Sequence, residues 1–582
     1  MGRPRVQSTA PSAQSTSAGR SPASTEKLGD VSRLLRARSF WVDGDSKAAQ
    51  RVRTNLQLGP VQLDRESAAW ISDGRLPDDK LGISLDDGAA LLGPHSFGFL
   101  NNLDGIAPLA APLGERPRVG RVALVVPRRD ALPELAPLLC SRLLSVSWLI
   151  SVGDGDPAEV LRFLQHDPAT AGLLVALGKG VRPQSLLDAL SGKPSVVLLP
   201  TVHRDLGLLR AVARRSLSRV TASFEEWLAH GALLDVGFGP SPQGRSGSRR
   251  GVSSQRRASV LVFGAGADLI QRELDALRLP GPIRVDADDE AAVDRALLRA
   301  TEQSELLILC GDKEQLAELR PSRPALLLDP SERDRLRALL VAMLSLSASS
   351  AAHAPVVIRP VRDRLETVLH ELPPPLYVAG EMVKSEPLSD HDAKRLLHSY
   401  GVRVTRQAPV STTTSALRVA AKLGTPVWVL PGLPPSEDVT KLGTAESRDG
   451  VLCETQAEVK RQTSLLLGRH EYVLLREVSP RGPSLRVQLV RERGLGDVLR
   501  VEPLLAEADA EASLLPMFAD DAEALARVWA APGDADQLEA LAMLISQVAA
   551  CIDEQKLQGE LVIRVSDEPV VLHAAVALRR ER

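Results

Sequence analysis

The chain has 582 residues, too many for one hydrophobic core, so about three to five domains are expected. Hydrophobic residues make up 44% of it and charged residues 25%, ordinary fractions for a globular protein. A net charge of −2 and an aromatic content of only 3% give no electrostatic or base-stacking case for a nucleic-acid partner. Because no hydrophobic signal core opens the chain and no apolar run approaches about 20 residues, we expect a cytoplasmic protein without a membrane partner.

The cysteines are too widely spaced for a disulfide framework or a zinc site. The chain has four, at Cys140, Cys310, Cys453 and Cys551, and no CxxC or His/Cys cluster. We therefore predict buried free thiols in a reducing compartment.

The first 115 residues divide into a polar tail and a weakly patterned region. Residues 1–29 are rich in Ser, Ala, Pro, Gln and Arg and are expected to be disordered, because they cannot bury enough apolar surface. In residues 30–115 the pattern predicts a strand at 39–42 and a helix at 45–56. No glycine-rich turn joins the two, so a dinucleotide loop is not expected there.

Residues 120–200 show the most regular pattern of the chain. Four short apolar runs alternate with three helical patterns, at 122–126, 132–144, 147–151, 158–165, 173–177, 184–190 and 195–199. Apolar runs bounded by Gly and Pro are typical of strands buried on both faces, and parallel neighbours need crossover helices. In such sheets ligands bind beyond the carboxyl ends of the strands, so we expect site residues in 127–130, 152–156 and 178–180.

A second alternating unit follows a basic linker at 239–257. Its apolar runs and helical patterns again predict a doubly wound sheet, at 259–264, 269–277, 283–285, 290–301, 306–310, 313–319, 325–328 and 333–346. Gly264–Leu269 begins like G-x-G-x-x-G but has leucine as its sixth residue. A tight turn is favoured over a cofactor loop.

The last third of the chain predicts an α+β region built around antiparallel sheets. Ser389 and Asp392 are placed to cap a helix that ends before Gly401. Further strands and helices are predicted at 402–407, 415–423, 426–430, 471–477, 484–491, 522–530, 535–552, 560–565 and 569–572.

Several ordered motifs resemble those of the NDP-forming acyl-CoA synthetases, the family of ADP-forming acetate–CoA ligase and succinyl-CoA ligase. Leu92–Asn101 resembles the pattern L-G-P-N-C-x-G-x-x-N, and Ser151–Thr170 resembles S-x-G-N…D-P-x-T. Lys193–Val197 is similar to K-P-V-V-V. Leu388–Val402 and Leu423–Val427 resemble the beginning of the family's ATP-grasp domain.

The resemblance implies an α/β multidomain fold, with two flavodoxin-like doubly wound parallel-sheet units and a C-terminal α+β ATP-grasp-like domain. Its domains would be a truncated CoA-binding-like region (30–115), two flavodoxin-like domains (116–238 and 258–348) and a degenerate ATP-grasp-like domain (385–582), with a second linker at 349–384. The family's cofactors are CoA, ATP and Mg²⁺.

The catalytic positions implied by the resemblance carry other residues. Where the family has a phosphohistidine, an alignment on Trp227 places Ser216; neither His203 nor His230 fits the motif. The other replaced positions are the phosphate loop at Pro127–Asp130, the carboxylate position at Gly178, the lysine position at Leu430 or Pro431, the H-K-S-D-type loop at Pro434–Asp438, and the metal-ligand positions at Val562 and Arg564. Losing lysine, metal ligands and phosphohistidine together removes the family's phosphoryl-transfer chemistry.

The favoured hypothesis is a non-catalytic relative with a binding or regulatory role, in which Arg128, Arg129 and Lys179 contact an anionic ligand. The ligand would be CoA or a nucleotide, and no metal site is expected. Two alternatives stay open, an active ligase completed by a partner subunit and an interaction scaffold. Homo- or hetero-oligomers are compatible with each of these hypotheses.

Overall fold

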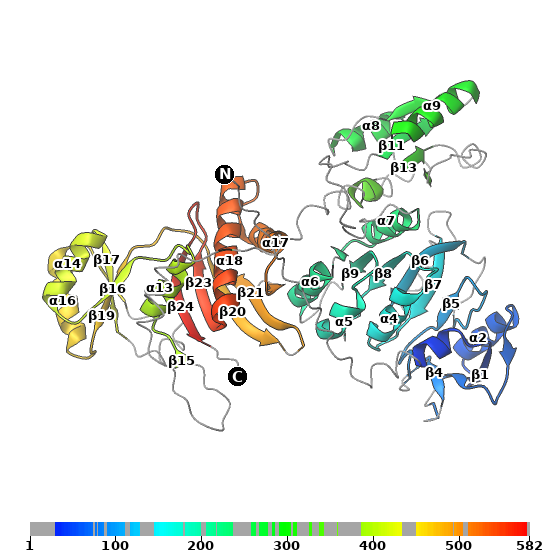
Figure 1. Cartoon of the computed structure of the whole chain (residues 1–582), viewed down its shortest axis with the longest axis horizontal. Coiled ribbons are helices and arrows are strands. Elements are labelled where there is room, and N and C mark those ends of the chain that lie inside the picture. The colour runs from blue at the N-terminus through cyan, green and yellow to red at the C-terminus, as the bar shows by residue number, and fades with distance from the viewer. Residues whose placement is uncertain are drawn as a thin grey trace, which may run out of the picture.

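The computed structural model shows a mixed α/β chain with five sheets (Figure 1). It describes residues 30–578 except 74–75, 78–79, 87–89, 111–116, 128–144, 179–180, 200–204, 217, 237–257, 264–266, 277–281, 286–289, 304–305, 311–324, 329–336, 343–357, 359–385, 433–449, 493 and 505–509. The predicted tail at 1–29 and both predicted linkers lie outside these residues, apart from residue 358. The finer assignments, flavodoxin-like and ATP-grasp-like, stay predictions.

A four-stranded parallel sheet opens the described chain, here called the N-terminal sheet. Its order is β2-β1-β3-β4, from β1 (Ser39–Asp43), α2 (Lys47–Gln57), β2 (Gln62–Leu63), β3 (Ala69–Ser72) and β4 (Leu81–Ser84). The strand and helix predicted at 39–42 and 45–56 are confirmed. The Ser46 hydroxyl caps α2 by accepting from the backbone N–H of Ala49.

The second sheet, here called the first six-stranded sheet, has the order β10-β9-β8-β6-β7-β5. Its elements are β5 (Phe99–Asn101), β6 (Val119–Val126), β7 (Val146–Ser151), α4 (Ala158–His166), β8 (Gly172–Ala176), α5 (Pro183–Ala189), β9 (Ser195–Leu198), α6 (Leu206–Arg215), β10 (Arg219–Thr221) and α7 (Phe224–Asp235). All pairs are parallel except β5 with β7. The predicted parallel strands are thereby confirmed, whereas the helix predicted at 132–144 lies outside the described residues.

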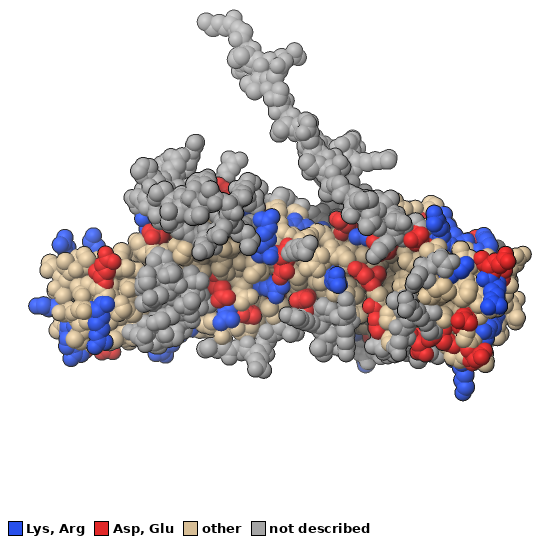
Figure 2. Space-filling model, turned by 90° about the horizontal axis from the view of Figure 1, so that it is seen from below, with Lys and Arg blue, Asp and Glu red and all other residues tan. Residues whose placement is uncertain are grey.

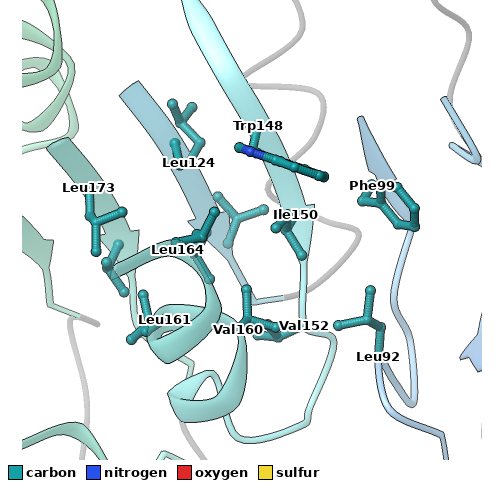
Figure 3. Close-up of a cluster of buried hydrophobic side chains, with 14 of the residues drawn as sticks. Leu92, Phe99, Leu124, Trp148, Ile150, Val152, Val160, Leu161, Leu164 and Leu173 are labelled. Atoms are coloured by element: carbon teal, nitrogen blue, oxygen red, sulfur yellow. The ribbon is translucent and has the colours of Figure 1, made fainter. Parts of the chain in front are cut away.

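The core of this sheet joins α4 to the strands (Figure 3). Leu161 and Leu164 of α4 lie over Leu124, Ile150 and their neighbours, all almost completely buried. Continuous apolar strands such as β6 are buried on both faces, as parallel strands require.

Two of the recognised motifs hold this core in place. The Asp167 carboxylate accepts from the indole N–H of Trp148 at 2.9 Å and from the Thr170 hydroxyl at 2.7 Å. The Lys193 ammonium donates to the carbonyls of Leu164 (2.7 Å) and Asp167 at the end of α4. A cation at a helix C-terminus satisfies carbonyls that lack intrahelical partners. These motif residues therefore support the scaffold.

The middle sheet is parallel, with the order β12-β11-β13-β14. Its elements are β11 (Ala258–Phe263), α8 (Ala267–Ala276), β12 (Ile283–Val285), α9 (Glu290–Gln303), β13 (Leu306–Cys310) and β14 (Ala325–Leu328). Strands and helices predicted in these stretches are confirmed, and residues 337–342 form part of the last predicted helix. The helix predicted at 313–319 and residues 264–266 of the predicted turn lie outside the described residues. The middle sheet packs on α7, whose Ala229, Ala232 and Leu233 belong to its core.

The C-terminal region, residues 386–578, contains two antiparallel sheets, as predicted. The second six-stranded sheet has the order β15-β24-β23-β20-β21-β22, and the small antiparallel sheet β16-β19-β17-β18. The elements are β15 (Glu386–Pro387), α13 (Asp390–Ser399), β16 (Gln407–Val410), α14 (Thr413–Leu423), β17 (Val427–Pro431), β18 (Val451–Cys453), α16 (Gln456–Leu467), β19 (Val473–Glu477), β20 (Ser484–Glu492), β21 (Gly496–Pro503), β22 (Glu511–Leu514), α17 (Ala519–Trp529), α18 (Ala535–Gln555), β23 (Leu557–Arg564) and β24 (Val570–Leu578).

The strand predicted at 402–407 is wrong. Val404 forms only an isolated bridge to Val571, and the strand β16 begins at Gln407. Between them, the Thr405 side chain accepts from Lys394 of the buried charge cluster described below, and Arg406 pairs with Glu477. The predicted cap is confirmed, since the Ser389 hydroxyl accepts from the N–H of Asp392 and Gly401 has a φ of 83°.

Within the described residues, α18 alone is long and apolar enough to cross a membrane by length and composition. Its buried side chains include Leu541, Val548 and Ile552, which belong to the core of the C-terminal region. Cys310, Cys453 and Cys551 are free and buried, as predicted, whereas Cys140 lies outside the described residues. Burial raises the pKa of the Cys310 thiol to about 12.

A buried charge cluster joins the two sheets of the C-terminal region. Asp390 on α13 pairs with Lys394 (3.2 Å), with Arg476 of β19 (2.8 Å) and with the Nδ1 of His573 on β24 (2.9 Å). These side chains are at most 4% exposed. Lys394 also donates to Thr405, Gln407 and the carbonyl of Leu572, at 2.7–2.9 Å. One carboxylate therefore ties α13 to both sheets.

Removing this carboxylate should destabilise the C-terminal region strongly. Asp390→Asn leaves Lys394 and Arg476 buried without their anion, which costs about 3–5 kcal/mol. Urea unfolding followed by circular dichroism measures the loss. Glu523→Gln is the matched control, since Glu523 forms an exposed pair with Arg527 on α17 and such pairs contribute about 0–1 kcal/mol. A change of less than about 1 kcal/mol in Asp390→Asn would contradict this role.

The same carboxylate predicts acid sensitivity. Burial alone would raise the pKa of Asp390, but Lys394, His573 and Arg476 together hold it well below its ordinary value. Because the folded pKa lies below that of the unfolded chain, about 3.9, the stabilisation is complete above that value and is lost as pH falls through the folded pKa. The difference in unfolding free energy between the unsubstituted protein and Asp390→Asn should thus be larger at about pH 6 than at about pH 3. An equal difference at both pH values would argue against this linkage.

Candidate functional site

The candidate site lies at the carboxyl edge of the first six-stranded sheet, where β6, β7 and β8 end side by side. The loop at 93–98 folds against the end of β7. Gly93 donates to the carbonyl of Val152 at 3.2 Å, and Asp154 donates its N–H to the carbonyl of Pro94 at 2.8 Å. The Ser96 hydroxyl bonds the carbonyl of Ser151 at 2.7 Å. Two loops far apart in sequence are thus fastened together.

Gly153 makes this close approach feasible. Its φ is 63°, and a Cβ there would stand 2.0 Å from the carbonyl oxygen of Pro94. Both the backbone conformation and the space therefore require glycine. This is a physical reason for the glycine in the S-x-G-N-like motif.

The side chains of His95 and Asp154 lie close together on these two loops. The His95 Nε2 lies 3.7 Å from an Asp154 carboxylate oxygen, and the side chains are 31% and 41% exposed. His95 has a φ of 60°, and within the described residues only Lys556 shares a positive φ among non-glycine residues. A non-glycine residue held in this region costs about 1–3 kcal/mol and is enriched at functional sites. The family motif L-G-P-N-C-x-G-x-x-N has asparagine at the position of His95, and the motif S-x-G-N has asparagine at the position of Asp154.

The segments that follow β7 and β8 supply polar contacts. The Asp156 carboxylate accepts from the N–H of Ala158 at 3.1 Å and from the Ser185 hydroxyl at 2.9 Å, so it ties the start of α4 to α5. Gly178 has no side chain to act as an acid, and a Cβ there would lie 3.0 Å from the Cβ of Pro127. Among the residues that the structure describes, no group of three or more His, Cys, Asp or Glu could hold a metal ion.

The predicted anion contacts Arg128, Arg129 and Lys179 lie outside the described residues. The residues that precede them, Pro127 and Gly178, lie against one another at the ends of β6 and β8. These three side chains remain a prediction. On the face shown in Figure 2, acidic and basic residues are intermixed over the described surface.

Ser216, at the position of the expected phosphohistidine, lies at the end of α6 and is 8% exposed. Its hydroxyl is within hydrogen-bond distance of the carbonyls of Val212 (2.9 Å) and Leu187 (3.1 Å). His230 is buried on α7, with Nδ1 2.7 Å from the Glu226 carbonyl, and burial lowers its pKa. His203 lies outside the described residues.

In the C-terminal region, the positions at which the resemblance expects catalytic residues hold side chains with structural contacts. Leu430 is buried in β17, and Val562 is completely buried in β23 against Val570 and Leu572. The Arg564 guanidinium donates to the carbonyl of Gly482. Residues 434–438 lie outside the described part.

Solved structures that match parts of the chain include those of archaeal proteins. A protein of Pyrococcus horikoshii OT3, PH0766, is 14% identical and covers 55% of this chain and 100% of its own, with a TM-score of 0.42. The apo form of the dinucleotide forming acetyl-coenzyme A synthetase 1 of Ca. Korarchaeum cryptofilum is 15% identical and covers 55% and 98%, with a TM-score of 0.41. A structure of that synthetase with coenzyme A, Ca-AMPCP and HgCl+ is 19% identical and covers 33% and 94%, with a TM-score of 0.28.

No protein-family model and no curated protein matches the chain. At these identities and scores, the likeness to the solved structures carries no argument about chemistry.

Sequence reasoning did not predict the pairing of His95 with Asp154 or the cluster around Asp390. The first joins residues 59 positions apart in sequence (154 minus 95), so no local pattern reveals it. The second had one local signal, the i,i+4 spacing of Asp390 and Lys394 on a predicted helix.

A substitution at Gly153 tests the contact between the loop at 93–98 and the loop that follows β7. Gly153→Ala should destabilise the protein by about 2 kcal/mol or more, because the methyl group meets the Pro94 carbonyl as well as an unfavourable backbone conformation. Gly533→Ala is the control, since Gly533 has a φ of 85° but nothing within 4 Å of a built Cβ. Equal losses in urea unfolding for the two variants would show that the Pro94 contact contributes nothing.

Proposed function

We propose that this chain is a non-catalytic relative of the NDP-forming acyl-CoA synthetases, with a binding or regulatory role. The observation that carries the proposal is the environment of Ser216. A buried hydroxyl beside two main-chain carbonyls has no basic nitrogen to accept a phosphoryl group, and its position is not open to substrate.

The framework residues at the other expected catalytic positions support the same proposal. Phosphoryl transfer requires cations around the transferring group, and carbonyl and carboxylate oxygens around Mg²⁺. Leu430 and Val562 provide neither, and both are buried in strands. The proposal therefore rests on replaced side chains and not on any missing ligand.

The proposed ligand is anionic, CoA or a nucleotide, and it would bind at the carboxyl edge of the first six-stranded sheet. Arg128, Arg129 and Lys179 are the proposed contacts, because guanidinium and ammonium groups recognise phosphate. Gly178 and Pro127, which precede them, lie together at this edge. A cytoplasmic location is part of the same proposal.

Titration calorimetry with CoA and with ATP–Mg²⁺ tests the binding role. We expect saturable binding of at least one of the two, weakened about tenfold or more in the double variant Arg128→Ala/Arg129→Ala, because charge-assisted bonds to phosphate contribute roughly 1.5–3 kcal/mol each. Arg418→Ala, an exposed arginine on α14, is the matched control. No heat with either ligand would contradict the binding role.

Incubation with acetate, ATP–Mg²⁺ and CoA tests the absence of catalysis. We expect neither acetyl-CoA nor a phosphoenzyme from radiolabelled ATP. Turnover by the purified chain would refute the proposal. Turnover only after a partner subunit is added would instead support the partner-completed ligase.

A further inference from the structure

The C-terminal region and the first six-stranded sheet meet where α6 lies against β22. Gly207, near the start of α6, bridges to Glu511 of β22. A Cβ on Gly207 would stand 2.1 Å from the carbonyl oxygen of Ala510, so the helix backbone touches the strand directly. The two elements come from parts of the chain about 300 residues apart.

Three arginines on α6 each contact a different part of the C-terminal region. Arg210 pairs with the carboxylate of Glu511. Arg214 pairs with Asp521 of α17 at 2.8 Å and donates to the carbonyl of Ala512 at 2.6 Å.

Arg215 binds the turn after β22. It donates to the carbonyls of Leu514 (2.9 Å) and Pro516 (2.6 Å), and its guanidinium carbon lies 4.4 Å from the centre of the Phe518 ring. Arginine combines several donors with a planar face that stacks on aromatic rings, so this recognition is specific for arginine.

The contact is also apolar. Leu495, Val498, Ala512 and Leu514 of the C-terminal region belong to the same buried cluster as the core of the first six-stranded sheet. A continuous apolar core with charged bonds at its edge is typical of a stable interface. The middle sheet, in contrast, is attached through α7.

We infer that β21, β22 and the turn at 514–518 form a docking surface for α6. The non-covalent contacts of this surface are sufficient to hold the C-terminal region on the first six-stranded sheet, even when the chain is cut on both sides of the middle sheet. The partner that fits it is a helix with an apolar face and arginines one turn apart, as α6 presents. The inference does not depend on the proposed function.

Cleavage of the folded protein tests this inference. Specific protease sites inserted into 239–257 and 359–385 would divide the full chain into N-terminal, middle and C-terminal fragments after it has folded. We expect the C-terminal fragment to stay with the N-terminal fragment during gel filtration. Its separation from the N-terminal fragment in the otherwise unsubstituted protein would overturn the inference.

Charge reversal then tests the arginines. In Arg214→Glu/Arg215→Glu the affinity of the C-terminal fragment should fall about 100-fold or more, because the pair of Arg214 with Asp521 is replaced by repulsion and Arg215 loses its bonds to the carbonyls of Leu514 and Pro516. The middle fragment should remain bound through α7, which shows that the first six-stranded sheet is still folded. Arg418→Glu is the control for added negative charge.

A compensating exchange guards against simple misfolding. Arg214→Glu combined with Asp521→Arg should recover part of the retention lost in Arg214→Glu alone, as expected for a direct pair. Full retention in the double charge reversal, or no recovery in the exchange, would show that the arginines do not select this surface.

Discussion

Helix α6 lies between the first six-stranded sheet and the C-terminal region, and the contact between these two parts depends on it. It covers one face of the first six-stranded sheet with residues such as Leu209 and Val212, and it presents Arg210, Arg214 and Arg215 to the C-terminal region. In Figure 1 it lies at the junction of the two parts. Ser216, the position at which the resemblance expects a phosphohistidine, directly follows this helix.

The parallel strands could be predicted from the sequence because each is a short, continuous apolar run between glycine and proline. Val122–Val126 and Leu306–Cys310 are examples in which pattern and strand coincide closely. The helix cap at Ser389 was equally predictable, since capping depends on residues three positions apart. These elements are determined by residues that are close together in the sequence, so a sequence pattern is sufficient to predict them.

The strand expected at 402–407 shows where local patterns fail. Its side chains alternate, yet Thr405 and Gln407 are bound by Lys394 from α13, and Val404 pairs only once. The pairing of His95 with Asp154 is likewise a product of two loops meeting. The sequence shows that Leu430 and Val562 are apolar where the resemblance implies a lysine and a metal ligand, but it did not predict that both side chains are buried. Such contacts depend on tertiary structure, which one sequence does not display.

The charge cluster around Asp390 limits which amino-acid substitutions this chain can accept during evolution. Loss of any one member leaves an uncompensated buried charge, whereas joint replacement of all its charged members by well-packed apolar residues is close to neutral. Neutral drift proceeds by single steps, and each single step here passes through a destabilised protein. Ser216, whose neutral hydroxyl lies beside main-chain carbonyls, carries no charge and faces no such barrier. We therefore expect Asp390, Lys394 and Arg476 to be retained or replaced together, whereas Ser216 can change singly.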